Sequence, residues 1–159
     1  MKPASLPVIR KELNHLGEDE LRQLVLRLGR FKKENKELLH YLLFEADYEE
    51  GFRQNIMEHI DTLFAEISHR NYYYIKKSVR KIMREVRKYI RYSGNKETEV
   101  VLLTHFLKAM RKITPSITRD RVLRSLYERT HDSTLKKIAA LHEDLQLDYR
   151  QELDKLNKG

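Results

Sequence analysis

The chain has 159 residues, of which 40% are hydrophobic and 35% charged, with no cysteine and 32 lysines and arginines against 24 acids. The lack of cysteine excludes disulfides and cysteine-based zinc or iron–sulfur sites, and the many apolar residues argue against intrinsic disorder. The longest uncharged apolar run, residues 100–107, is much shorter than the ~18 residues of a membrane span, so no span is expected.

Nearly every segment has the apolar period of an amphipathic helix, and no period of two residues predicts a strand. The first helix is expected to begin at Ser5 and to stop at Gly17 in a left-handed conformation. The second begins with three acids at 18–20, which favour a helix N-terminus. Its helical spacing predicts a buried stripe made of Leu21, Leu24, Val25 and Leu28.

The next two helices are predicted in the segment before residue 70. One starts near Asn35 and contains the apolar run 38–44. The other is expected to begin with a capping box of Asp47 and Glu50 and to end near residues 68–71. Residues 45–69 hold seven acids and a single base, Arg53, so this second helix is strongly acidic.

A strongly basic helix is predicted over residues 72–92. Residues 70–91 carry nine bases and one acid, so this segment alone equals the net charge of +8 of the whole chain. The sequence Ser93-Gly94-Asn95 predicts a break, in which Gly94 ends one helix and Asn95 caps the next.

Three more helices are predicted in the C-terminal part. The first, over 96–112, is very apolar, and the second, over 119–130, is short. Asp132 or Ser133 is expected to cap a long final helix with an apolar stripe over 135–156.

Together these elements predict an all-α fold, a single compact bundle of about eight helices that forms one domain over residues 1–159. A short stack of helical hairpins of the HEAT or armadillo kind is the alternative, and the lack of a fixed repeat favours the bundle. The N-terminus has no apolar segment of the kind found in a secretory signal before the charged residues 10–12. A cytoplasmic location is therefore expected.

The basic side of the helix at 72–92 is the candidate functional site. At 1.5 Å per residue its cations form a stripe about 21 Å long, which suits several phosphates of a nucleic-acid backbone or an acidic protein surface. The candidate anion-binding residues are Lys77, Arg80, Lys81, Arg84, Arg87, Lys88 and Arg91. The sequence therefore predicts a helical binding module, and the lack of any nucleotide-binding or nucleophile motif predicts no enzyme and no cofactor.

Two other interpretations stay open. In one, the preceding acidic helix neutralises the basic face, and the protein is a structural or protein–protein interaction bundle, such as a homodimer formed through the helix at 96–112 or the last helix. In the other, Glu-x-x-His pairs bind two metal ions, as in carboxylate bundles. These pairs are Glu12/His15, Glu37/His40, Glu66/His69 and Glu128/His131. Glu66 and His69 lie off the apolar stripe of their helix, so no metal site is expected.

Four stretches of the chain carry a resemblance to known sequences. They are LPVIRKELNHLGEDEL at 6–21, FKKENKELLHYLLFEADYE at 31–49, KYIRYSGNKETEV at 88–100 and LHEDLQLDYRQEL at 141–153. These stretches resemble a family of small, uncharacterised, all-helical bacterial proteins. The resemblance implies a bacterial cytosolic setting and supplies no catalytic residues.

Overall fold

The computed structural model describes residues 1–68 and 70–158. These residues form eight α-helices and no strand, which confirms the all-α class and the predicted number of helices. The chain divides into two compact units, Met1–Phe44 and Glu45–Gly159. This division leaves the expectation of one domain over residues 1–159 as a prediction.

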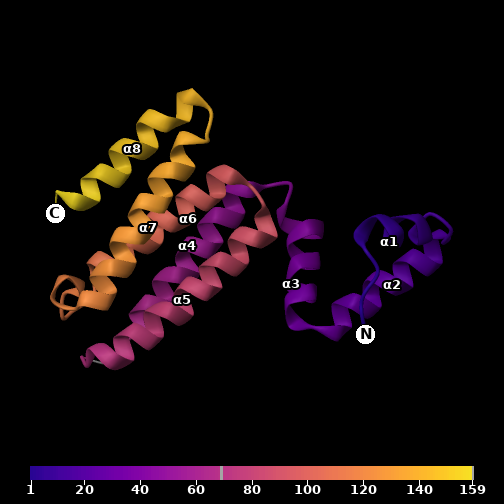
Figure 1. Ribbon diagram of the computed structural model, residues 1–159, viewed down its shortest axis with the longest axis horizontal. Helices are drawn as coiled ribbons and strands as arrows, with labels where there is room; N and C mark the ends of the chain where they lie inside the picture. The colour runs from indigo at the N-terminus through magenta and orange to yellow at the C-terminus, as the bar shows by residue number, and fades with distance from the viewer. Residues whose placement is uncertain (69, 159) are drawn as a thin grey trace. The chain divides into compact units, whose positions relative to one another are not determined.

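The first unit contains three helices, α1 (Leu6–Leu13), α2 (Glu18–Phe31) and α3 (Lys33–His40) (Figure 1). The prediction for Gly17 is wrong, because its φ is −76° and it is the N-cap of α2 rather than a left-handed stop. The Gly17 amide donates to Glu20 Oε2 at 2.9 Å. The three acids therefore lie at the start of α2 as predicted. Glu20 also accepts a hydrogen bond from an amide that has no partner within the helix.

The predicted buried stripe of α2 is wrong as well. Leu24, Val25 and Leu28 are 37%, 40% and 52% exposed. The α2 helix packs against α3 through a different side, where Gly29 lies so close to Leu39 that an added Cβ would stand 2.9 Å from Leu39 Cδ1. Local spacing predicted the apolar stripe, but the choice of packing face depends on α3.

The second unit contains five helices, α4 (Glu49–Ala65), α5 (Tyr72–Ser93), α6 (Lys96–Arg111), α7 (Arg121–Ala139) and α8 (Glu143–Asn157). The α6 helix contacts each of the other four, and Figure 1 shows it between the α4–α5 pair and the α7–α8 pair. The second unit is therefore a helical bundle built around α6.

The central position of α6 follows from its composition. Apolar residues surround most of this helix, and the buried ones are Val100, Leu102, Leu103, Phe106, Leu107, Ala109 and Met110. They are buried within the second unit. The wide apolar surface that motivated a homodimer through this helix is therefore occupied by α4, α5, α7 and α8.

The start and end of α4 differ from the prediction. A π-helical turn at Tyr41–Glu45 continues the preceding helix, so only residues 46–48 separate it from α4. Asp47 is exposed in this short connection, and Tyr48 is the N-cap without a side-chain hydrogen bond. The α4 helix then ends at Ala65 rather than near residues 68–71.

The predicted limits of α5 and the start of α6 are confirmed. Asn71 Oδ1 accepts the Tyr73 amide at 2.8 Å, and Gly94 ends α5 with a φ of 65°. Asn95 Oδ1 accepts the Thr98 amide at 3.0 Å. These caps depend on residues within three positions of the helix end, so the sequence contains the information that determines them.

The predicted boundary between the last two helices is wrong. Asp132 and Ser133 are exposed and lie inside α7, which starts after a 3₁₀ turn at 117–119. The hydroxyls of Thr130 and Thr134 donate to the carbonyls four residues earlier, at 2.8 and 2.7 Å, so these buried groups are satisfied within a continuous helix. The true break follows Ala139, and His142 caps α8.

Candidate polyanion-binding surface

The α5 helix presents an apolar side to the bundle and a basic side to solvent. Its buried residues are Ile75, Val79, Ile82, Met83 and Val86. Six of the seven predicted anion-binding residues are exposed, namely Lys77, Arg80, Lys81, Arg84, Arg87 and Arg91. We call these six residues the basic face. The seventh, Lys88, is half-buried.

Two other lysines of α5 lie against acids. Lys76 Nζ is 3.5 Å from Asp120 Oδ2 at the start of α7, and Lys88 Nζ is 3.2 Å from Glu85 Oε2. The Leu123 amide donates to Asp120, and this bond first, with Lys76 after it, holds the pKa of Asp120 below its ordinary value. The basic face is different, because none of its six cations forms an ion pair with an acid in the described part of the chain.

The acids of the preceding segment have contacts elsewhere. Asp61 Oδ1 lies 2.7 Å from His105 Nε2 on α6, and Glu58 accepts a hydrogen bond from Gln54 at 2.9 Å. Across residues 45–68, no acid pairs with a cation of the basic face. Neutralisation by the acidic helix, which the sequence left open, is therefore not observed for these six cations.

A groove with a cavity volume of about 700 Å³ extends the basic face from α5 towards α7. Its cations are Arg87 and Arg91 on α5 and Arg129 and Lys137 on α7, and Lys137 Nζ lies 2.8 Å from Glu99 Oε1. Its apolar lining consists of Met83, Ile90, Leu103 and Leu126. The sequence reasoning missed Arg129 and Lys137, although their spacing of eight residues places both on one face of a helix.

A second cationic pocket, of about 550 Å³, has lining residues from α6, α8 and the turn before α7. Two of its cations contact neighbouring side chains. Lys108 forms a close ion pair with Glu152 of α8, and the Arg111 guanidinium lies 5.7 Å from the centroid of the Tyr127 ring. Both side chains therefore contribute to packing within the bundle, which distinguishes them from the basic face.

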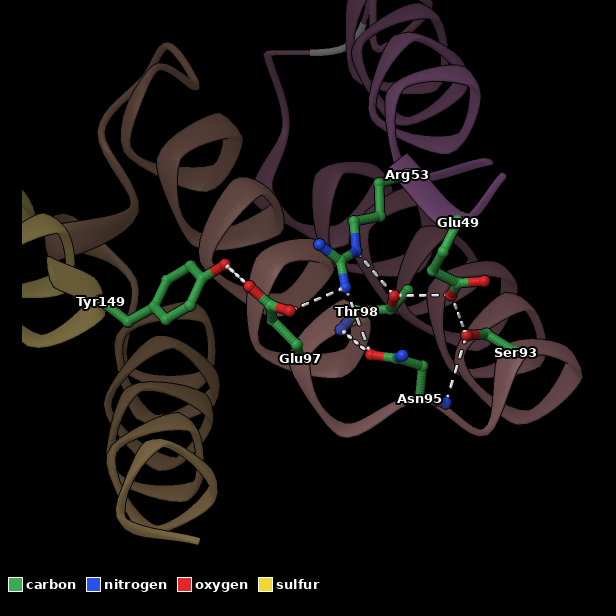
Figure 2. A network of polar contacts seen from close by, with 7 residues as sticks. All are labelled: Glu49, Arg53, Ser93, Asn95, Glu97, Thr98 and Tyr149. Carbon is green, nitrogen blue, oxygen red and sulfur yellow. Dashed lines mark hydrogen bonds and ion pairs between the residues drawn. The ribbon is translucent and has the colours of Figure 1, made fainter. Parts of the chain in front are cut away.

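A polar network around Arg53 ties α4 to α6 and α8 (Figure 2). Arg53 donates through Nε to Thr98 Oγ1 at 2.8 Å and through Nη2 to Glu97 Oε2 at 3.2 Å and Asn95 Oδ1 at 3.3 Å. The Tyr149 hydroxyl donates to Glu97 Oε1 at 2.5 Å. Burial, followed by this bond to Glu97, raises the pKa of Tyr149 above its ordinary value, so the phenol keeps its proton.

The network continues into the turn between α5 and α6. Thr98 Oγ1 donates to Glu49 Oε1 at 2.6 Å, the Ser93 hydroxyl donates to the same oxygen, and the Asn95 amide donates to Ser93 Oγ at 3.2 Å. The Arg53 side chain is 16% exposed, and its donors are directed at these partners. The network therefore holds α4, α6 and α8 against one another. The sequence signal for this network was a single base, Arg53, next to Phe52 in an otherwise acidic segment.

The Glu-x-x-His pairs that lie wholly within the described residues do not gather into a metal site. Residue 69 lies outside the described residues, and within residues 1–68 and 70–158 no three histidine or acidic side chains gather as metal ligands would. His131 lies inside α7, where its Nε2 is 3.2 Å from Asn157 Nδ2 of α8.

None of the described helices combines the length and apolar character needed to span a membrane. A scan of family models, a search of curated proteins and a search of solved structures find no match to this chain.

Proposed function

We propose that the protein is a non-enzymatic helical binding module that holds the backbone of a nucleic acid, without base specificity, on the basic face of α5. The observation that carries this proposal is the set of six exposed cations without an acidic partner in the described residues. Such a surface attracts phosphates and releases their counterions on binding.

The dimensions of the surface support a strand of nucleic acid as the ligand. At 1.5 Å per residue, the stretch from Lys77 to Arg91 is about 21 Å long. This length matches about six phosphates at 3.4 Å per phosphate of one strand. Arg129 extends the cationic surface sideways, across the groove, whereas Lys137 beside it is paired with Glu99. The proposal includes a cytoplasmic location and membership of the family of small bacterial proteins that the chain resembles.

The test is to measure the affinity for mixed-sequence oligonucleotides by fluorescence anisotropy at salt concentrations from about 50 to about 200 mM. If all six cations contact phosphates of a duplex, the logarithm of the association constant should fall with the logarithm of salt at a slope of about −5. The affinity should also be the same for unrelated base sequences.

An acidic protein surface is the competing ligand for this face. Saturable binding to polyglutamate with no binding to oligonucleotides would contradict the proposal. So would a salt slope near zero, because a shallow slope means that few phosphates are contacted.

A further inference from the structure

The first unit leaves most of its apolar side chains in solvent. Among residues 1–44, all of which the structure describes, only Tyr41 is buried. The apolar residues of α2 that are exposed include Leu24 at 37%, Leu28 at 52% and Phe31 at 78%. On α1, Leu6 is 78% exposed. A unit of this size without a core normally needs an additional partner to be stable.

Apolar residues of α2 form a regular seam, in which Leu24, Leu28 and Phe31 are exposed and Leu21 is half-buried. Leu21, Leu24, Leu28 and Phe31 alternate in steps of three and four residues, which is the spacing of the core positions in a coiled coil. We call these four residues the α2 seam. On another flank of α2, Gly29 lies against Leu39 of α3. The seam is therefore a second apolar face, and α3 does not cover it.

The exposed apolar side chains of α2 are neighbours rather than isolated residues, because Val25 at 40% exposure lies beside Leu24 and Leu28. A standard interface buries about 800 Å² on each partner, so an interface centred on the seam also includes side chains beside it.

The charges of α2 indicate what that second helix is. Its first turn contains Glu18, Asp19 and Glu20, whereas the end of the helix carries Arg27, Arg30 and the C-cap Lys32. When two copies of α2 lie antiparallel, the acidic end of each meets the basic end of the other, and a two-fold axis makes both contacts at once. A parallel pair would place like charges together. An anionic lipid surface would require a polar side that is basic along its whole length.

We propose that the protein forms a homodimer through its first unit, in which the α2 seams of two copies pack antiparallel. This interface differs from the homodimer that the sequence left open as an alternative, which used the helix at 96–112 or the last helix. It uses no residue of the basic face, so it stands independently of the proposed nucleic-acid function.

The test is sedimentation equilibrium of the full chain, with a double variant in the seam, Leu24→Glu/Leu28→Glu. The wild-type protein should be a dimer, and the variant should dissociate with a dimer dissociation constant at least ~100-fold higher. The control is Val122→Glu/Leu147→Glu, which places the same charges at apolar residues that are 38% and 63% exposed in the second unit. This control should remain a dimer. Far-UV circular dichroism should show that both variants keep their helix content.

Charge reversal tests the antiparallel orientation. The variant Glu18→Lys/Glu20→Lys makes both ends of α2 basic, and Arg27→Glu/Arg30→Glu makes both ends acidic. Each variant alone should be monomeric, and an equimolar mixture should form heterodimers. A wild-type protein that is monomeric at every concentration would overturn the proposal, even if it bound anionic vesicles. A dimer that survives the double seam variant would also overturn it.

Discussion

Reversal of three charges on the basic face, Arg80→Glu/Arg84→Glu/Arg87→Glu, is expected to lower the affinity for mixed-sequence nucleic acid by about 100-fold at low salt. Each of these arginines is exposed and lacks an acidic partner among the described residues. The variant should therefore lose three phosphate contacts while its fold remains. The salt slope should become shallower by about 3, since each lost contact removes nearly one counterion.

The choice of positions separates binding from stability. Lys88 is kept because it contacts Glu85. The matched control is Arg124→Glu/Arg150→Glu/Lys155→Glu, three exposed residues outside the groove between α5 and α7. Both triple variants lower the net charge equally, so a difference in affinity between them reports local contacts. Equal affinities would contradict the assignment of the site to α5.

Replacement of Arg53 by leucine is expected to lower the free energy of unfolding by about 2–3 kcal/mol, because Glu97 then loses its charged partner in a mostly buried position. Arg53 also holds Asn95, which caps α6, and Thr98. Its loss therefore affects the start of the central helix of the second unit.

Urea unfolding followed by circular dichroism measures this effect. Tyr149→Phe removes only the hydrogen bond to Glu97 and should cost about 1 kcal/mol. The double variant Arg53→Leu/Glu97→Gln should lose less than the sum of the two single variants, because the glutamine removes the charge that Arg53→Leu leaves unpaired. A change below 0.5 kcal/mol for Arg53→Leu would show that the network adds little to stability, since that is the usual range of surface substitutions.

The features that the sequence predicted are those that depend on neighbours within a few residues. The limits of α5 follow from Asn71 and Gly94, and the separation of its apolar and basic sides follows from spacing at 100° per residue. The very apolar segment at 96–112 is the buried central helix, since only a helix surrounded by others can bury side chains on all sides.

The features that it missed depend on contacts between distant segments. The α2 seam reads as a core stripe, and only the packing of α3 on another side shows that it is exposed. Asp132 resembles a helix cap, but the burial of Thr134 against the bundle keeps α7 continuous. The Arg53 network joins residues more than 40 positions apart, so no local pattern contains it.

The most direct test of the proposed site is to map the surface that a short mixed-sequence oligonucleotide touches, by amide chemical-shift changes in the ¹⁵N-labelled protein. The largest changes should cluster between Lys77 and Arg91 on α5 and at Arg129 across the groove. Changes centred instead on Lys108, Arg111 and Lys155 in the second cationic pocket, or spread evenly over the chain, would contradict the proposed site.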